Sequence, residues 1–506
     1  MRVLFIYPDL SSTITHYTGT LSYGVASLAA VLREEGHEVG LLHLIASPRE
    51  EEFRARVRAA RPELVAFSSN SHYARRLRSW TTWAREASGA PVVVGGVHAT
   101  LAPEEVSALP DVDFTCVGEG EQALAELCRT LESGADPAGI RNLWVRGGVS
   151  VVRNAPRPQV QDLDALPDPD FSVFDFGRLY DVRKGIFMYL MSRGCPHSCT
   201  YCCQHALRSA APHSGRSWRF LSPRRAVEQL ATLLARHLPE VRLVSFIDAI
   251  FFPERAWLEE FAPLYRRRIG LPFACNMRAD RLDRESAALL RDLGCRCVRL
   301  GVESGDERIT SQVLKRGLEA ADLRRAFALL REHGMARWSY NMVGLPTETL
   351  RSALKTVVLN AELDPEFAIT FIFYPYPGTA LRALCAASGQ LTGREYDNYG
   401  VGVTARLPQF PETDVLFVQR FFRGLIRLYA RGMRLPGRWP ARWTSVLDAT
   451  LSSPLFPRAA LVRGAEAYRR VRHRAGEHLV RRSPILYRLL GGRDPVWRFR
   501  EKELAA

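Results

Sequence analysis

SRGCPHSCTYC, residues 192–202, places three thiols in the spacing Cys-x3-Cys-x2-Cys. The stretch begins at the end of an apolar run, 186–192, which predicts a strand, so the thiols fall in the loop that follows it. Such a loop can wrap three thiolates around one iron–sulfide cube and leave the fourth iron without a protein ligand. A zinc site is the alternative, because His197 or His205 is available as a fourth ligand. We predict no role for Cys203, the neighbouring thiol.

The strand before the thiols is the first of a series. We expect six strands alternating with helical patterns, and a fold in which the strands are parallel. The predicted strands are 186–192, 241–247, 272–277, 296–302, 338–343 and 367–374, and the predicted helices are 223–237, 284–293, 320–333 and 349–361. Six such units predict a partial (β/α)6 barrel rather than a closed eight-stranded barrel.

An earlier series of short apolar strands precedes the barrel, with helical patterns at 24–35 and 121–132. The strands are predicted at 3–7, 39–45, 63–69, 91–95 and 112–117. This alternation predicts an α/β fold with an N-terminal doubly wound, Rossmann-like sheet. The predicted domains are 1–146 for this sheet, 147–184 for a proline-rich linker, 185–390 for the barrel and 391–506 for a basic, mostly helical C-terminal region.

Composition narrows the class of protein. The chain has 506 residues and 47% hydrophobic content, enough for large cores. Its start, MRVLFIYPDL, lacks a secretory apolar region, and no run of about twenty apolar residues is present, so we expect a cytoplasmic protein. Ten cysteines are too sparse for a disulfide scaffold.

The thiol spacing, with Tyr201 directly before the last thiol, resembles the radical S-adenosylmethionine (SAM) superfamily. The resemblance implies that Cys195, Cys199 and Cys202 hold a [4Fe–4S] cluster whose open iron chelates SAM. One electron from the cluster then yields a 5′-deoxyadenosyl radical. The resemblance also implies an electron donor such as flavodoxin or ferredoxin.

Segments at the ends of later strands are similar to the SAM-binding motifs of this superfamily. By resemblance, Asp248 lies near the amino group of SAM, where relatives commonly have two acids and this chain has Ala249 second. Arg278 corresponds to the arginine that reaches the SAM carboxylate, with an ion pair to Asp280 as the alternative. Glu303 and Ser304 correspond to ribose contacts. Segments 341–348 and 374–379 resemble the fifth- and sixth-strand turns.

The first 150 residues resemble the cobalamin-binding domain that precedes many radical SAM barrels. The resemblance rests on GGVHAT at 95–100 and VGEGE at 117–121. The implied cobalamin contacts are Ser68, Ser69, Asn70, Gly95, Gly96, His98, Thr100, Gly118 and Glu119. A generic dinucleotide-binding domain is the alternative, but the first strand lacks G-x-G-x-x-G. An Asp-x-His-x-x-Gly motif is also missing, so we expect no protein histidine below cobalt.

Together the two resemblances imply a cobalamin-dependent radical SAM methyltransferase. It would methylate an unactivated carbon of a small-molecule, natural-product or lipid-like substrate through a 5′-deoxyadenosyl radical and methylcobalamin. Cyclisation, rearrangement or oxidation without methyl transfer is the alternative, and a non-catalytic cobalamin-binding regulator is an alternative of another class.

Most of the positive charge lies in the C-terminal region. The net charge is +15, and residues 414–506 carry 20 Lys and Arg against 7 Asp and Glu. Phe421, Phe422, Leu425, Ile426 and Tyr429 interleave with Arg423, Arg427 and Arg431 at helical spacing. The pattern predicts a solvated face, an anionic substrate, or peripheral contact with an anionic inner membrane surface. No nucleic-acid-binding module is present.

Overall fold

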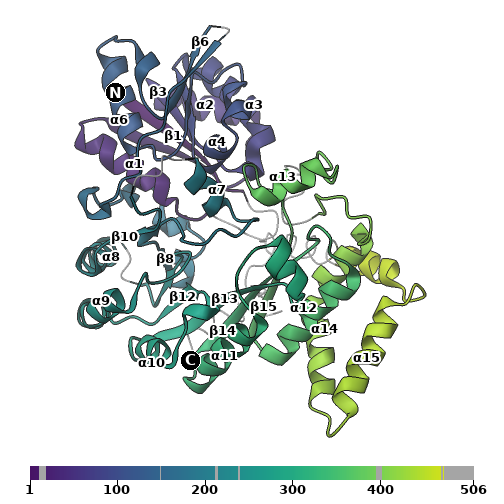
Figure 1. The fold of residues 1–506 in the computed structure, drawn as a ribbon. Coiled ribbons are helices and arrows are strands. Elements are labelled where there is room, and N and C mark those ends of the chain that lie inside the picture. The colour runs from purple at the N-terminus through teal and green to yellow at the C-terminus, as the bar shows by residue number, and fades with distance from the viewer. Residues whose placement is uncertain are drawn as a thin grey trace.

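The computed structural model describes residues 1–10, 19–148, 150–210, 215–237, 240–394, 402–468 and 471. Two sheets organise these residues, a seven-stranded sheet at the N-terminus and a six-stranded sheet below it in Figure 1. The cysteine-bearing loop and a short helix, α7 (Cys203–Ser209), lie where the two meet.

The N-terminal sheet has the order β2-β1-β3-β4-β5-β6-β7. Its strands are β1 (Arg2–Pro8), β2 (Glu38–Leu44), β3 (Leu64–Ser68), β4 (Val92–Gly95), β5 (Phe114–Cys116), β6 (Leu143–Gly147) and β7 (Ser150–Arg153). The first five pair in parallel, as predicted, whereas β6 and β7 pair antiparallel. The sheet continues to Arg153, and the predicted domain end at residue 146 falls inside β6.

Helices cover both faces of this sheet because alternate strand residues point to opposite sides. Val3 and Phe5 of β1 pack against α1 (Tyr23–Glu34) and α6 (Glu121–Glu132). Leu4 and Ile6 pack on the other face against α2 (Glu50–Ala60) and α3 (Ala74–Ser88). The short helices α4 (Val97–Leu101) and α5 (Pro103–Ser107) follow β4. The carboxyl ends of the parallel strands point toward the second sheet (Figure 1).

The second sheet confirms the prediction of six parallel strands. Its order follows the chain: β8 (Ile186–Tyr189), β11 (Leu243–Phe246), β12 (Phe273–Met277), β13 (Cys295–Glu303), β14 (Ala336–Val343) and β15 (Phe367–Ile372). Helices α8 (Pro223–His237), α9 (Arg255–Arg268), α10 (Arg284–Asp292), α11 (Ala320–Glu332) and α12 (Leu350–Leu363) cover its outer face. Since β8 and β15 are opposite edges of the sheet, the barrel is open.

The C-terminal elements extend the core of the barrel. They are α13 (Ala380–Ala387), α14 (Glu412–Met433) and α15 (Trp439–Ser452). Phe422, Leu425 and Tyr429 of α14 are buried against residues of β14, α12 and β15. The predicted apolar stripe at 421–429 is thus a packing face rather than a surface for a membrane. Among the described residues, no helix is both long enough and apolar enough to cross a bilayer.

Candidate functional site

A two-stranded ladder holds the start of the cysteine loop. β9 (Ser192–Arg193) pairs antiparallel with β10 (Arg219–Phe220). Gly194 follows with φ +88°, and a Cβ there would lie 1.9 Å from the Ser217 carbonyl oxygen. Glycine is therefore required for the chain to leave the ladder and enter the loop.

The far side of the loop is anchored to a π-helix at Ile309–Val313. The Thr200 hydroxyl donates to the Val313 carbonyl at 2.6 Å, and the Thr200 N–H donates to the Leu314 carbonyl at 3.1 Å. π-Helical turns are rare and recur at functional sites. Here the turn supplies carbonyls that fix the loop between the second and third thiols.

The three predicted thiols share one neighbourhood. Burial raises the pKa of Cys195, the thiols of Cys202 and Cys199 add to that increase, and Arg278 opposes it. Cys199 is likewise raised by burial, opposed by Arg316 and Arg278. Metal coordination would displace the thiol protons. Three thiols on one loop next to two guanidinium groups can hold an iron–sulfur cluster.

A zinc site and an iron–sulfur cube need different distances between their ligand side chains. Within the described part of the chain, no three His, Cys, Asp or Glu side chains are close enough together to hold a single metal ion. Ligands of a four-iron cube bind different irons and stand further apart than ligands of one tetrahedral ion. The two kinds of site therefore differ in the ligand spacing they need, and ligation of a cube by Cys195, Cys199 and Cys202 stays a prediction.

Sequence reasoning missed Arg316, which links the cysteine loop to β13. Its Nη1 donates to the Tyr201 hydroxyl at 2.7 Å and to Glu303 Oε1 at 2.9 Å, and its Nη2 donates to the Gly301 carbonyl at 3.0 Å. Burial alone would lower the pKa of Arg316, but Tyr201 and Glu303 raise it overall. An arginine after a π-helix has no motif of its own, so only the fold reveals this contact.

Glu303, a predicted ribose contact, lies at the strand end with φ +65°. Burial raises its pKa, opposed by Arg316 and by a hydrogen bond from Tyr201. Ser304 is 2% exposed, and its hydroxyl accepts from the Asp306 N–H at 3.2 Å. The structure therefore places Glu303 beside the cysteine loop, whereas the Ser304 hydroxyl stabilises the turn after β13.

Arg278 is also next to the loop but is already paired. Its Nε donates to both oxygens of Asp280, at 2.9 and 3.0 Å, and its Nη2 donates to the Arg316 and Gly317 carbonyls at 2.5 and 3.0 Å. The alternative of an ion pair with Asp280 is thus present: the Arg278 side chain is 7% exposed, whereas that of Asp280 is 32% exposed. A contact between Arg278 and SAM stays a prediction.

Asp248 lies beneath the loop. Its Oδ1 accepts from the Met191 N–H at 2.9 Å and from the Ser192 hydroxyl at 2.5 Å, while its buried Oδ2 has no partner. The carboxyl is fully buried, and burial raises its pKa to about 7. Its neighbours Ile247 and Ala249 line a cavity instead. This geometry favours support of the strand end over the predicted contact with the SAM amino group.

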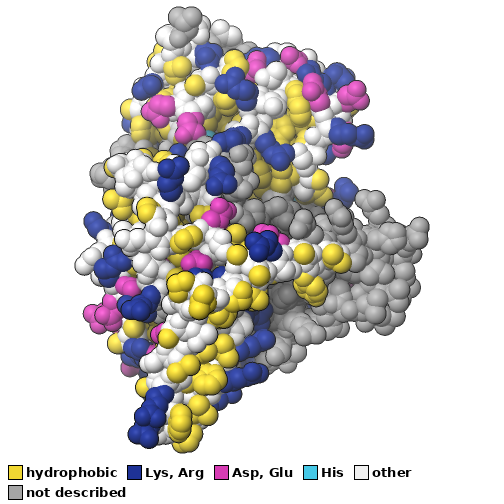
Figure 2. All heavy atoms as spheres, turned by 90° about the vertical axis from the view of Figure 1, so that its right-hand side faces the viewer, with side chains coloured by type: hydrophobic (Ala, Val, Ile, Leu, Met, Phe, Trp, Pro, Cys, Tyr) yellow, Lys and Arg dark blue, Asp and Glu magenta, His cyan; other side chains and the backbone are white. Residues whose placement is uncertain are grey.

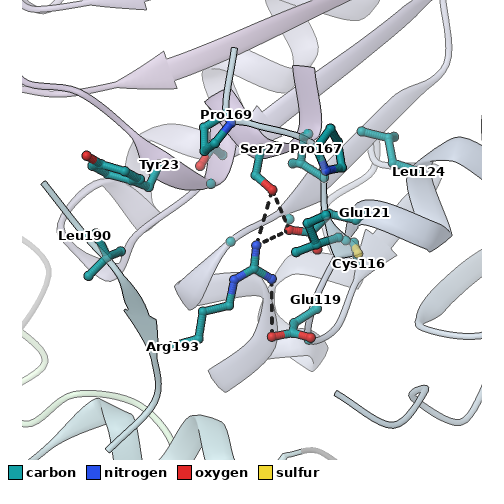
Figure 3. A pocket seen from close by; sticks show the side chains of 18 of the residues that line it. Tyr23, Ser27, Cys116, Glu119, Glu121, Leu124, Pro167, Pro169, Leu190 and Arg193 are labelled. Carbon is teal, nitrogen blue, oxygen red and sulfur yellow. Dashed lines mark hydrogen bonds and ion pairs between the residues drawn. The ribbon is translucent and has the colours of Figure 1, made fainter. Parts of the chain in front are cut away.

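Two cavities open at the junction of the two sheets. The apolar cavity, about 310 Å³, extends into the N-terminal domain, where Phe5 lines it. Figure 3 shows Tyr23 and Leu124 on its walls. The junction cavity, about 360 Å³, lies between the loops after β4 and β5, the linker residues 156–160, and the start of the cysteine loop. Both lie at the carboxyl ends of the parallel strands, where ligands of such sheets bind.

The predicted cobalamin contacts divide into two groups. Ser68 and Gly95 line the apolar cavity, Thr100 lines the junction cavity, and Gly96, Gly118 and Glu119 line both. Gly96 has φ +95°, and a Cβ there would lie 2.5 Å from the Ser69 carbonyl oxygen. Glycine is therefore required at 96 for the turn after β4 to pass this close to the backbone of Ser69.

The remaining three predicted contacts face the protein. Ser69 is 4% exposed and its hydroxyl donates to the Gly95 carbonyl, and the Asn70 side chain accepts from the His72 N–H. His98 is 1% exposed, lies 3.2 Å from the Ser71 hydroxyl, and has its pKa lowered to about 4 by burial. A hydrogen bond between His98 and the corrin periphery stays a prediction; in this geometry the ring is buried behind the turn.

Two protein families match this chain, one over the N-terminal domain and one over the barrel. The B12 binding domain family matches residues 15–128, and the Radical SAM superfamily matches residues 189–359. The chain is a cobalamin-binding radical SAM enzyme. A [4Fe–4S] cluster, SAM and cobalamin are therefore its cofactors, and the described residues at the junction fit them through three neighbouring thiols and glycine-lined cavities.

Curated relatives of this enzyme include methyltransferases and cyclases. An uncharacterised methyltransferase of Pyrococcus horikoshii is 25% identical over 79% of this chain and 86% of its own length. An anaerobic magnesium-protoporphyrin IX monomethyl ester cyclase of Rubrivivax gelatinosus is 24% identical over 74% of this chain and 68% of its own.

Solved structures share the fold. The radical SAM methyltransferase TsrM of Kitasatospora setae, with cobalamin and a [4Fe–4S] cluster bound, superposes with a TM-score of 0.64 at 19% identity, covering 92% of this chain and 99% of that one. The cobalamin-dependent SAM radical enzyme OxsB with aqua-cobalamin superposes with a TM-score of 0.65 at 16% identity, covering 89% and 71%.

Proposed function

We propose that this enzyme transfers a methyl group to an unactivated carbon of a small-molecule or lipid-like substrate. The observation that carries the proposal is the junction cavity, to which both cofactor domains contribute. Thr100 and Gly118 line it from the cobalamin side, and Ser192, Gly194 and Ala249 line it from the barrel side. A substrate held there can meet both cofactors without leaving the protein.

When bound, the cofactors supply a methyl carrier and a 5′-deoxyadenosyl radical. The residues of the chain hold and orient them. Cys195, Cys199 and Cys202 would bind the cluster, and Arg316 fixes the loop by bridging Tyr201 and Glu303 at 2.7 and 2.9 Å. The protein's task is positioning, because a misplaced reacting atom costs rate steeply.

Product analysis tests methylation. Anaerobically reconstituted enzyme with SAM, cobalamin, a reductant and candidate substrates is expected to form S-adenosylhomocysteine and 5′-deoxyadenosine together. Formation of deoxyadenosine without adenosylhomocysteine, over the full set of substrates that stimulate SAM cleavage, would rule out methyl transfer.

Cyclisation or oxidation is the second candidate, favoured by the three anaerobic cyclases among the relatives. These are 24 to 26% identical over 72 to 75% of this chain. The same product analysis separates the two functions, since a cyclase consumes SAM to deoxyadenosine without producing a methylated product.

We also propose peripheral contact of the C-terminal region with an anionic membrane. Exposed apolar side chains gather on and around α15, beside arginines, and Figure 2 shows hydrophobic and basic groups together over this lower part of the molecule. They include Leu435, Trp439, Val446, Leu455 and Leu461. Apolar insertion combined with basic flanks is the pattern of interfacial binding.

Vesicle co-sedimentation tests this contact. The enzyme is expected to sediment with phosphatidylglycerol vesicles but not with phosphatidylcholine vesicles, and less so at high salt. Trp439→Ala together with Leu455→Ala is expected to weaken sedimentation, whereas Val152→Ala, which removes an exposed apolar side chain from β7, should not. Equal binding to both lipids, or none, would remove the proposal.

A further inference from the structure

Two carboxylates of the N-terminal domain pair with two arginines of the cysteine-bearing ladder. Arg219 Nη2 donates to Glu119 Oε1 at 2.8 Å, and Arg193 Nη2 donates to Glu121 Oε1 at 2.6 Å. Arg193 Nη1 also lies 3.4 Å from Glu119 Oε1. Figure 3 shows the Arg193 side chain reaching from the barrel side into the space between the two carboxylates. The VGEGE segment thus joins the two domains.

The four charged side chains form one mostly buried group, in which two positive charges balance two negative charges. The side chains of Arg219 and Glu121 are 3% and 7% exposed, and those of Arg193 and Glu119 are 26% and 20% exposed. Buried charges are tolerated only when paired, and removing one partner leaves the other uncompensated. Ser27 adds a neutral donor, its hydroxyl lying 2.9 Å from Glu121.

The linker is held by the same group. Glu119 Oε2 accepts from the Val160 N–H at 2.8 Å, and Arg219 Nη1 donates to the Val160 carbonyl at 2.5 Å. Both oxygens of Glu119 therefore already accept hydrogen bonds from the protein. These two hydrogen bonds hold the Glu119 carboxylate between the linker and β10.

The position of the group connects it to both cofactors. Arg193 is two residues before Cys195, and Glu119, Glu121 and Arg193 line both the apolar cavity and the junction cavity. We infer that Glu119 is a positioning residue and not a cobalamin contact: with Arg193 and Arg219 it forms an interdomain latch that sets the distance between the cluster loop and the cobalamin cavity. The inference rests on the proposed function only in requiring that both cofactors bind.

A distance measurement tests the latch. Reduced cluster and cob(II)alamin are both paramagnetic, so pulsed dipolar EPR on the reconstituted enzyme reports their separation. The wild type is expected to give one narrow distance distribution. Glu119→Gln and Arg219→Gln are each expected to broaden it and to raise the Kd of cobalamin by about fivefold or more.

The double variant Glu119→Gln with Arg219→Gln distinguishes a latch from a direct contact. If the two residues act as one pair, the double variant changes the distance distribution and the Kd of cobalamin no more than either single variant does. Independent effects would add instead. Arg193→Gln, at a more exposed position, provides a second partner variant if Arg219→Gln does not fold. Glu332→Gln, which breaks an exposed ion pair with Arg284 between α10 and α11 on the outside of the barrel, is the matched control and should change neither measurement.

Two outcomes separate the latch from a direct corrin contact and from the proposed methyl transfer. If Glu119→Gln weakens cobalamin binding while the distance stays narrow and Arg219→Gln binds cobalamin normally, Glu119 is a corrin contact and the latch is rejected. Wild-type enzyme that keeps the narrow distance but makes no adenosylhomocysteine would contradict methylation and leave the latch supported.

Discussion

At the scale of single residues, the site depends on buried charges that sequence patterns do not expose. Arg316 bridges Tyr201, one residue before the predicted cluster ligand Cys202, and Glu303, at the end of β13. Side chains of Arg316 and Glu303 are 7% and 12% exposed. Their ion pair is therefore screened only weakly by solvent. Each charge depends on the other to offset the free-energy cost of its burial.

Replacing Arg316 by Met should destabilise the barrel. We expect the free energy of unfolding to fall by roughly 3–5 kcal/mol, because Glu303 loses its cation while remaining buried. Urea denaturation followed by tryptophan fluorescence measures the change. Arg284→Met, which breaks the exposed pair with Glu332, is the control and should cost no more than about 1 kcal/mol. Equal losses for both variants would contradict this role.

Asp248 predicts a pH dependence of stability. Burial raises its pKa to about 7, so the folded protein keeps a proton that the unfolded chain has already lost. Stability should therefore fall as the pH rises from about 4 to about 7, by roughly 1.4 kcal/mol per unit, and level off above. Asp248→Asn removes this titration while Oδ1 can still accept from Met191 and Ser192.

The measurement is the difference in unfolding free energy between wild type and Asp248→Asn across that pH range. Relative to the variant, the wild type should become progressively less stable up to about pH 7. A difference that does not change with pH would show that Asp248 is ionised throughout, and would restore the case for a cationic partner such as the SAM ammonium.

At the scale of elements, a short ladder decides where the thiols lie. β9 and β10 pair over only two residues each, and Gly194 passes so close to Ser217 that a side chain cannot fit. The sequence predicts the thiols and the strand before them. It gives no signal for the ladder, because its partner strand begins 26 residues after Arg193 and two-residue strands have no periodicity.

Gly194→Ala should displace the cysteine loop. The Cβ would stand 1.9 Å from the Ser217 carbonyl oxygen and φ is +88°, so the ladder must open. We expect iron content after reconstitution to fall to less than about half of the wild-type value, in line with a cost of a few kcal/mol for a strained backbone. Gly139→Ala has free space around its Cβ and should leave iron content unchanged.

At the scale of the whole molecule, the two cofactor sites lie on different domains that meet at the junction cavity. The predicted cluster thiols follow the first barrel strand, whereas the predicted cobalamin contacts that line the cavities come from the ends of β3 and β4 and from the segments after β4 and β5. Loss of one cofactor should therefore leave the binding of the other largely intact.

Cys199→Ala tests this independence. We expect the iron content to fall to near zero, because two thiolates hold the cube poorly, while cobalamin still binds with a Kd within about threefold of the wild type. Iron analysis measures the iron content, and visible absorption measures the amount of bound cobalamin. Cys203→Ala changes the adjacent thiol and should retain iron. Loss of cobalamin together with iron in Cys199→Ala would contradict independent sites.

The sequence by itself determined the α/β class, both strand series, the three thiols and the two cofactor families, because hydrophobic periodicity and cysteine spacing act locally along the chain. Only the tertiary structure decided which side chains face a cavity. It buried His98 and Asp248, moved the phenylalanines of α14 into the core, and brought Arg316, Arg193 and Arg219 to the site. Side-chain direction and ion pairing depend on contacts between segments far apart in sequence, and no local pattern encodes them.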